Sequence, residues 1–318
     1  MTDVFTLGEL LIDMVQTGSE GFQAKPGGAP ANVLAMLKKL GRTVYLQAKV
    51  GSDGFGTKLI STLRQERIPV AGICRHATIP TTLAIVQKDE SGDRTFSFYR
   101  QPGADIMLHK EEIDWDVLKN SRIFHFGTLS MTDEPCKSAT KEAIRIAKEN
   151  GILVSCDPNL RENLWRSPED AKQVMEYALS QCDILKISDN EIEFLTGMDD
   201  VIEGVRVLLR RYPNIRVAAA TCGAQGSILF AGGHQVEEKG YVVDTIETTG
   251  AGDTFCACLL DLVLKYGVDH LHPDAMRSGL RFANAAAALV TTRQGALTAM
   301  PTVQEVEALL FQQEKRAG

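Results

Sequence analysis

The sequence predicts an α/β fold in which a mostly parallel central sheet lies between two layers of helices, with a small β-sheet as a lid. The main observation is that apolar, strand-like runs alternate with helical patterns over most of the 318 residues. Strands joined by helices pair in parallel and carry helices on both faces. The second observation is a hairpin-like pair of strands that interrupts this order. No linker or internal repeat divides the chain, so we expect one domain over residues 1–318.

The first quarter of the chain sets the alternation. The run VFTLGELLIDMV predicts an opening strand at residues 4–15. A helix follows, with Pro30 near its first turn and Gly41 just past its end, which is the usual placement of these two residue types. TVYLQAKVG then predicts a strand, and a helix is expected over residues 53–67.

The interruption is the run TTLAIVQKDESGDRTFSFYRQPG, residues 81–103. Its two alternating strands surround the turn Glu90–Asp93, which is typical of a β-hairpin. Together with the segment after Leu11, it predicts a lid over one edge of the main sheet, formed by residues 11–27 and 79–103. An exposed lid edge needs a partner, so a homodimer through lid strands is expected.

The rest of the chain returns to the alternating order. Four more runs predict buried strands: SRIFHFGTL, GILVSCDPN, CDILKIS and IRVAAATCG. Helical patterns separate or follow them, at residues 134–150, 168–181, 254–266, 273–291 and 302–315.

Composition excludes several classes of protein. The formal net charge is −7 and no block of Lys and Arg occurs, so nucleic-acid binding is not expected. The start lacks a secretory signal, and the longest apolar stretches, such as Ala285–Val290, are too short to span a bilayer. The seven cysteines are scattered and odd in number, which indicates reduced thiols in a cytoplasmic protein rather than disulfides or zinc ligands.

The stretch ETTGAGDTFCACLL places small residues where a loop becomes a helix. Gly250, Ala251 and Gly252 could direct backbone amides at a phosphate, because the first N–H groups of a helix lack partners and carry partial positive charge. Asp253 beside such a site makes sense if its carboxylate orients an attacking hydroxyl. An aspartate in a first helical turn is also an ordinary helix cap, so this stretch alone leaves both interpretations open.

A second stretch, KPGGAPAN, precedes the first helix. Gly27 and Gly28 allow a polar ligand close to the backbone, and Asn32 offers both a donor and an acceptor. Asp13, near the end of the opening run, could accept hydrogen bonds from two sugar hydroxyls. Each feature also has a structural interpretation, as a turn, a first-turn asparagine and a strand-end cap.

Competing phosphate-binding patterns fail. In GSDGFGTK the order is Thr-Lys, which is not the Walker order. No G-x-G-x-x-G follows a strand, which argues against a dinucleotide-dependent oxidoreductase, and the protein-kinase motifs are absent.

The GG-x-x-x-N and GAGD motifs together resemble those of the ribokinase-like (PfkB) carbohydrate kinases, over nearly the whole chain. Within that family the likeness is greatest to the fructokinases, in the runs FQAKPGGAPANV, SFYRQPGADIML, HFGTLSMTDEPCKSA, DPNLRENLW and KISDNEIEFLTG. The resemblance implies a ribokinase-like fold and phosphorylation of a sugar hydroxymethyl group with ATP and Mg²⁺.

The resemblance also implies roles for individual residues. Asp253 is the base, Gly250, Ala251 and Gly252 form the anion hole, and Arg161 lies near the sugar and the transferred phosphate. The implied sugar-binding set is Asp13, Gly27, Gly28, Asn32, Phe96, Phe98, Asn159, Arg161 and Asp253. The implied nucleotide-binding set is Lys186, Glu191, Thr221, Gly223, Gly226, Gly250, Gly252 and Asn284. Glu191 is expected to act on Mg²⁺ through water, with Ser188 where the family usually has Asn. As structural alternatives, TCGAQG at residues 221–226 is a turn and Asn284 a buried helix polar residue.

A second departure concerns a monovalent cation such as K⁺. Glu247 stands where the family commonly has an Asp that helps to bind this ion, and the carbonyls near Thr249, Val290, Arg293 and Gly295 would complete the site. The longer carboxylate leaves open whether the ion binds, is displaced or is not needed.

Two alternatives to fructose phosphorylation remain open. A related kinase would act on aminoimidazole riboside, a ribonucleoside, ribose or 2-keto-3-deoxygluconate, since a few pocket groups decide specificity. A protein of another class would be a non-catalytic sensor of sugar or nucleotide on the same fold.

Overall fold

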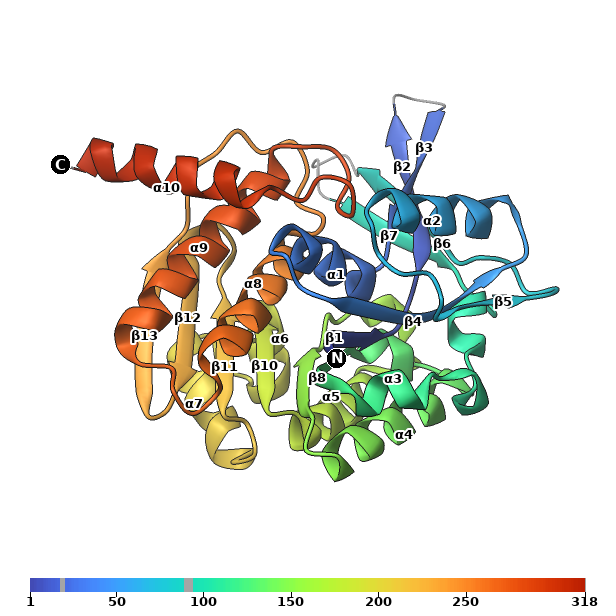
Figure 1. Cartoon of the computed structure of the whole chain (residues 1–318), viewed down its shortest axis with the longest axis horizontal. Coiled ribbons are helices and arrows are strands. Elements are labelled where there is room, and N and C mark those ends of the chain that lie inside the picture. The colour runs from blue at the N-terminus through green and yellow to red at the C-terminus, as the bar shows by residue number, and fades with distance from the viewer. Residues whose placement is uncertain (18–20, 89–93, 318) are drawn as a thin grey trace.

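The computed structural model describes residues 1–17, 21–88 and 94–317 (Figure 1). The strands of its larger sheet are β1 (Thr2–Leu7), β4 (Val44–Gly51), β5 (Ile73–His76), β8 (Ser121–Gly127), β9 (Leu153–Asp157), β10 (Ile184–Ser188), β11 (Val217–Thr221), β12 (Gly226–Ala231) and β13 (His234–Lys239). The strands of its smaller sheet are β2 (Leu11–Thr17), β3 (Gly21–Gly27), β6 (Leu83–Lys88) and β7 (Arg94–Tyr99).

The α-helices are α1 (Ala29–Lys39), α2 (Gly54–Gln65), α3 (Trp115–Lys119), α4 (Cys136–Glu149), α5 (Pro168–Gln181), α6 (Asp189–Thr196), α7 (Val201–Arg211), α8 (Ala251–Tyr266), α9 (Pro273–Thr291) and α10 (Val303–Ala317). Short 3₁₀ turns include η1 (Ala104–Met107), η2 (Lys110–Glu112) and η3 (Thr128–Met131). The predicted helices at residues 30–40, 53–67, 134–150, 168–181 and in the C-terminal third all have a counterpart here.

The larger sheet has the strand order β13-β12-β11-β10-β9-β8-β1-β4-β5, and the smaller one β3-β2-β6-β7. From β5 to β11 neighbouring strands are parallel, whereas β12 and β13 form an antiparallel edge. The predicted fold class is therefore confirmed: a mainly parallel sheet, helices on both faces and a smaller second sheet.

Two hydrophobic cores cover the two faces of the larger sheet. Consecutive strand residues point to opposite faces, so Val4 packs with α1, α8 and α9 while Phe5 packs with α4 and α5. In β11, Val217 to Ala220 are all fully buried, as expected of a parallel strand covered on both faces. Figure 1 shows α1, α8 and α9 on the side facing the reader and α3 to α7 behind or below the sheet.

Two expectations from the sequence need correction. The single strand predicted at residues 4–15 is two strands, β1 and β2, which belong to different sheets. Gly8 between them has φ 159°, and a Cβ there would lie 2.7 Å from Pro30 Cγ. The hairpin β12–β13 at the sheet edge was not predicted. The predicted turn Glu90–Asp93 lies outside the described residues, but β6 and β7 pair in antiparallel fashion.

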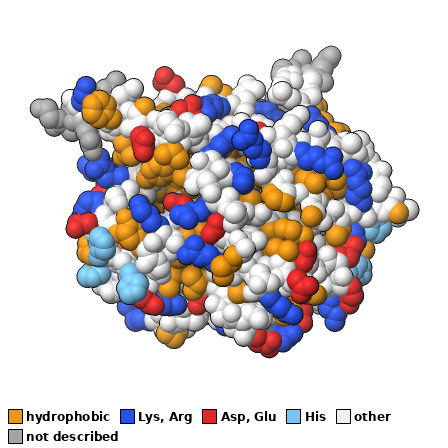
Figure 2. Space-filling model, viewed as in Figure 1, with side chains coloured by type: hydrophobic (Ala, Val, Ile, Leu, Met, Phe, Trp, Pro, Cys, Tyr) orange, Lys and Arg blue, Asp and Glu red, His pale blue; other side chains and the backbone are white. Residues whose placement is uncertain are grey.

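The surface charges, the helix hydrophobicity and the cysteines each bear on an expectation from the sequence. On the face shown in Figure 2, basic and acidic side chains are interspersed, with small apolar groups between them. No helix in the described ranges is long and apolar enough to cross a membrane. All seven cysteines are free thiols.

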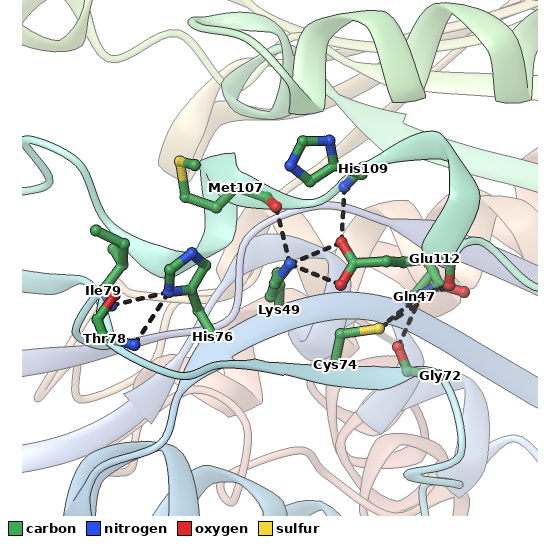
Figure 3. A network of polar contacts seen from close by, with 10 residues as sticks. All are labelled: Gln47, Lys49, Gly72, Cys74, His76, Thr78, Ile79, Met107, His109 and Glu112. Carbon is green, nitrogen blue, oxygen red and sulfur yellow. Dashed lines mark hydrogen bonds and ion pairs between the residues drawn. The ribbon is translucent and has the colours of Figure 1, made fainter.

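A polar network secures the far edge of the larger sheet (Figure 3). Lys49 of β4 donates to both carboxylate oxygens of Glu112, at 2.6 and 2.7 Å, and to the Met107 carbonyl at 3.0 Å. Gln47 donates to the carbonyls of Gly72 and Glu112. These contacts hold η1 and η2 against β4.

A buried ion pair anchors the smaller sheet to the larger one. Arg100, one residue after β7, donates from Nε to Asp105 Oδ2 at 2.8 Å and from Nη2 to the Leu129 carbonyl at 2.9 Å. The Arg100 and Asp105 side chains are only 5% and 1% exposed. Because Leu129 lies in η3, the turn that follows β8, this arginine fixes the base of β7 relative to the main sheet.

We expect Arg100→Met to lower the free energy of unfolding by about 3 to 5 kcal/mol, because it leaves the Asp105 carboxylate buried without its partner. Urea unfolding followed by circular dichroism measures this. Arg145→Met is the matched control, since Arg145 pairs with Glu142 and Glu149 at the surface, where ion pairs contribute little. Equal effects of the two substitutions would contradict the anchoring role.

Candidate active site

A cavity of about 930 Å³ opens at the carboxyl ends of β9 and β10. Ligand sites in open α/β sheets are expected at this edge. Most of the sequence-predicted sugar and phosphate residues line it: Asp13, Gly28, Asn32, Phe98, Asn159, Arg161, Lys186, Glu191, Gly250, Gly252 and Asp253. Residues from β2 to α8 therefore meet at one site.

The centre of the cavity is a contact between two helix starts. Asn32, in the first turn of α1, donates from Nδ2 to Asp253 Oδ2 at 2.8 Å. Asp253 lies in the first turn of α8, a helix that packs along α1. The two sequence motifs, 221 residues apart, are thus joined by a hydrogen bond.

The backbone before α8 is shaped by Gly250. It has φ 85° and precedes the helix as its N-cap, and a Cβ there would lie 2.6 Å from that of Ala296. The Ala251 amide donates to the Thr248 carbonyl at 3.3 Å, and Ala251 does not line the cavity. Gly252 does line it, and its amide lies in the turn where helical N–H groups lack intrahelical acceptors.

A cation sits beside that helix start. The Lys186 ammonium lies 3.2 Å from the place where a Cβ on Gly252 would be. It pairs with Asp157 at 3.1 Å, and both residues are buried. Burial lowers the pKa of Lys186, but the carboxylates of Asp157 and Glu191 outweigh burial and hold it above its usual value, so the ammonium stays charged. An anion at Gly252 would meet a helix N-terminus and an ammonium together.

The two aspartates that the sequence predicted for the sugar site, Asp253 and Asp13, both have raised pKa values. Desolvation raises the pKa of Asp253 to about 6, against the opposing hydrogen bond from Asn32. Desolvation, followed by the charge of Glu247, raises the pKa of Asp13 to about 7. Both groups therefore change charge close to neutral pH, as expected where carboxylates meet a bound substrate.

The Gly27–Gly28 pair makes room for Asp13. A Cβ on Gly27 would lie 2.2 Å from Asp13 Oδ2, and one on Gly28 would lie 2.4 Å from the Glu9 carbonyl oxygen. Gly28, with φ 119°, is the N-cap of α1. Gly27 itself does not line the cavity but lets the Asp13 carboxylate lie against the backbone.

Several other predicted sugar-side residues lie on one wall. Asn159, with φ 48°, and Arg161 follow β9, and Arg161 donates to the Leu160 carbonyl at 2.9 Å. Phe98 of β7 lines the cavity. The backbone of Phe96 pairs with Val86, but its side chain lies outside the described residues.

Glu191 has a structural task. Its Oε1 accepts from the Leu160 amide at 2.7 Å and its Oε2 from the Ser188 amide at 2.8 Å. Glu191 thus caps α6 and holds the loop after β9 in place, with its carboxylate at the cavity wall.

The remaining predicted nucleotide residues do not line the cavity. Thr221 pairs in the sheet with Ser188, and Ser188 does line the cavity. Gly223 and Gly226 shape the turn into β12. Asn284 accepts from Ser227 Oγ at 2.8 Å and donates to the carbonyls of Glu238 and Lys239. Asn284 therefore ties α9 to the β12–β13 edge, which matches the structural alternative for this residue.

The predicted cation cluster forms a second polar group behind Gly250. Glu247 accepts on Oε2 from the Gly295 amide at 3.0 Å and from Lys25 of β3 at 2.8 Å. The Val290 carbonyl accepts from the Arg293 amide at 3.4 Å, and Arg293 pairs with Glu305 through its side chain. Thr249 lines the main cavity.

Sequence reasoning missed three functional candidates. Asp157 and Lys25 act through ion pairs that no local pattern reveals. Glu9, directly after β1, is buried, and desolvation raises its pKa to about 7. Among the described residues, Glu9 Oε2 and Asn32 Oδ1 are buried without a hydrogen-bond partner, and both residues line the cavity. A polar residue at the carboxyl end of a parallel strand was the available signal for Glu9.

Comparison with known proteins agrees with this geometry. The family model "pfkB family carbohydrate kinase" matches residues 1–303. The chain is 38% identical to probable fructokinase-2 of Arabidopsis thaliana over 97% of this chain and 95% of the relative. A fructokinase from Xylella fastidiosa, solved with bound ATP, superposes with a TM-score of 0.91 at 32% identity, covering 99% and 100% of the two chains. A fructokinase double mutant from Vibrio cholerae O395, solved with fructose, ADP and a potassium ion, superposes with a TM-score of 0.87 at 31% identity, covering 98% of each chain.

We expect Asn284→Ala to lower the free energy of unfolding by about 1 to 3 kcal/mol, because the buried Ser227 hydroxyl on β12 and two carbonyls on β13 lose their hydrogen bonds. Chemical unfolding measures this change. Asn120→Ala serves as the control, because Asn120 is exposed and bonds within its own helix end. A variant as stable as the control would argue against the structural role.

Proposed function

The chain belongs to the pfkB family of carbohydrate kinases, and from this premise we propose that it is a fructokinase that converts D-fructose and ATP to D-fructose 6-phosphate and ADP. Membership makes it a phosphotransferase that acts on a sugar hydroxyl. The choice of fructose rests on relatives that are 36–38% identical over nearly the full length and are named fructokinases.

One observation carries the proposal: Asp253 lies at the start of α8, hydrogen-bonded to Asn32 and in the same cavity as Asp13. A sugar bound by Asp13 and Asn32 would place a hydroxyl next to the Asp253 carboxylate. The neighbouring helix start and Lys186 would receive the negative charge of the transferred phosphate.

In this mechanism each residue has a separate task. Asp253 accepts the proton of the attacking hydroxyl, which a carboxylate ionised near neutral pH can do. Its hydrogen bond to Asn32 Nδ2 fixes which carboxylate oxygen faces the sugar. Gly250 and Gly252, with Lys186 and Arg161, stabilise the phosphoryl oxygens as the bond to the hydroxyl forms and the bond to the leaving phosphate breaks.

The sugar side fits a ligand with several hydroxyls. Asp13 offers two acceptor oxygens, and Glu9 Oε2 and Asn32 Oδ1 are buried acceptors without partners, which sugar O–H donors would satisfy. The smaller sheet supplies Asp13 and Phe98 to this wall, and we assign it the role of a lid in a one-domain protein. Homodimerisation through that sheet and a cytoplasmic location stay predictions.

The nucleotide side fits a metal that arrives with ATP. Among the described residues, no group of three or more His, Cys, Asp or Glu side chains could hold a metal by itself, and Mg²⁺ on a nucleotide keeps water and phosphate oxygens as most of its ligands. Bound Mg²⁺ neutralises phosphate charge. Glu191 would contact it through water, and the turn at Thr221, Gly223 and Gly226 would border the nucleotide.

We expect Asp253→Asn to lower kcat by about two to four orders of magnitude, because the base is lost while the amide keeps its size. The measurement is ADP release with fructose and ATP. Asp261→Asn on the same helix is the control, since Asp261 pairs with Arg42 near the surface. Near-normal turnover by Asp253→Asn, with unchanged thermal stability, would show that Asp253 is not the base.

The acceptor is tested by a panel at fixed ATP that contains fructose, ribose, aminoimidazole riboside, a ribonucleoside and 2-keto-3-deoxygluconate. We expect the highest kcat/KM with fructose. A higher kcat/KM with another acceptor would show that fructose is not the preferred substrate, but the protein would still be a kinase. Sugar binding by calorimetry without turnover of any acceptor would instead support the non-catalytic sensor.

Acidification should abolish activity through the two raised carboxyl groups. Asp253 and Asp13, with pKa values of about 6 and about 7, must both be ionised to accept hydrogen bonds from the sugar. We therefore expect log kcat/KM to be level well above pH 7, to begin to fall as Asp13 is protonated, and to approach a slope of two below the pKa of Asp253, because kcat/KM reports the ionisation of the free enzyme. A profile level down to pH 5 would contradict this.

A further inference from the structure

A buried ion pair joins the smaller sheet to the loop that leads into α8. Lys25 Nζ lies 2.8 Å from Glu247 Oε2, and the two side chains are 12% and 6% exposed. Lys25 comes from β3 and Glu247 from the segment three residues before Gly250. Lysine and glutamate side chains are seldom buried to this degree unless they are paired.

The loop around Glu247 is otherwise held by hydrogen bonds. The amides of Ile246 and Glu247 donate to the Thr291 carbonyl at 2.8 and 3.0 Å, and Gly295 donates to the same carboxylate oxygen that Lys25 contacts. Burial raises the pKa of Glu247, but the hydrogen bonds and charge of Lys25, with the Gly295 amide, outweigh burial and hold it below the usual range. The carboxylate is therefore ionised and needs a positive partner.

The residues do not fit a monovalent cation at this place. Such an ion requires several free oxygen ligands, but Glu247 Oε2 already accepts from an ammonium and an amide. The Lys25 side chain runs close to Gly295, with its Cδ 4.0 Å from where a Cβ on Gly295 would be. The position that the resemblance assigns to an ion is bordered by a lysine.

We propose that the Lys25 ammonium takes the place of the monovalent cation, so that this chain neither needs nor binds K⁺ beside the loop that leads into α8. The proposal rests on the kinase function proposed above and concerns the regulation of the same site. An ammonium carries the same single positive charge as K⁺ but is covalently attached, so its occupancy does not depend on the ion concentration.

The attachment also has a positional consequence. Lys25 lies directly across from Asp13 in the pairing of β2 with β3. The ion pair therefore connects the strand pair that carries Asp13 to the loop that carries Gly250. A dissolved ion could neutralise Glu247 but could not make this connection between the two sheets.

The first test uses the unmodified protein at constant ionic strength, with choline chloride replaced stepwise by KCl. Two quantities are measured: the Tm without substrates, and kcat/KM with fructose and MgATP. We expect less than about a twofold change in kcat/KM and no rise in Tm, because a ligand that does not bind cannot shift the unfolding equilibrium. A rise in Tm, or a large activation specific to K⁺, would overturn the proposal.

The second test removes the tethered charge. In choline chloride, Lys25→Met should lower the Tm by roughly 5 °C or more, because the Glu247 carboxylate stays buried without a partner. KCl should then raise the Tm of this variant, although it has no effect on the original chain. Lys25→Arg, which keeps the charge, should stay insensitive to KCl. Lys39→Met, which breaks an exposed pair with Glu66, controls for loss of a lysine.

The outcomes separate this proposal from the kinase assignment. If Lys25→Met is as stable in choline chloride as the original chain, the ammonium is not required and the proposal fails. If Lys25→Met does not fold, the first test decides alone. The Tm measurements do not require turnover. If the protein phosphorylates no acceptor but shows the expected Tm pattern, the proposed kinase function is rejected, while the proposal that Lys25 replaces the cation still holds.

Discussion

The hydrogen bond from Asn32 to Asp253 is the contact on which the site depends. It forms because α1 and α8 pack side by side and begin at the same edge of the main sheet. Each helix start is shaped by a glycine, Gly28 and Gly250, in a conformation that side chains rarely adopt. Gly28 lets the start of α1 lie against the Glu9 carbonyl, and Gly250 lets the start of α8 lie against Ala296. The hydrogen bond then sets the orientation of the carboxylate. Rotation of either helix start would separate the sugar side from the phosphate side of the cavity.

The cavity also depends on an arrangement of opposite charges. Carboxylates at Asp13, Asp157 and Asp253 face cations at Lys186 and Arg161. Asp157 is paired directly with Lys186, whereas burial outweighs the nearby cations at Asp13 and Asp253 and raises the pKa of both carboxyl groups. Asp157 and Lys186 lie in strands of the main sheet, Asp13 in a strand of the smaller sheet and Asp253 in the first turn of α8, while Arg161 lies in the loop after β9. Substrate charge can therefore enter a site whose positive groups are already in place.

The fold and the centre of the site could be predicted because their signals are local. Strand and helix periodicity identified the parallel sheet, and glycines before helices marked the sites around Gly28 and Gly250. What the sequence did not reveal depends on contacts between distant segments: the Asp157–Lys186 pair, the buried Glu9, and the Lys25–Glu247 pair, whose members are 222 residues apart. The short β12–β13 edge was missed because two strands of six residues carry few alternating positions.

The departure at Glu247 has a physical explanation in the pair with Lys25. A carboxylate that must meet an ammonium from another sheet benefits from an extra methylene, which an aspartate lacks. A longer side chain would be a disadvantage around a small ion held by backbone carbonyls, because it would crowd the ligand shell. Glutamate at position 247 and lysine at position 25 therefore make sense together and not separately. Their pairing exchanges an ion that can dissociate for a fixed contact between the strand pair carrying Asp13 and the loop before α8.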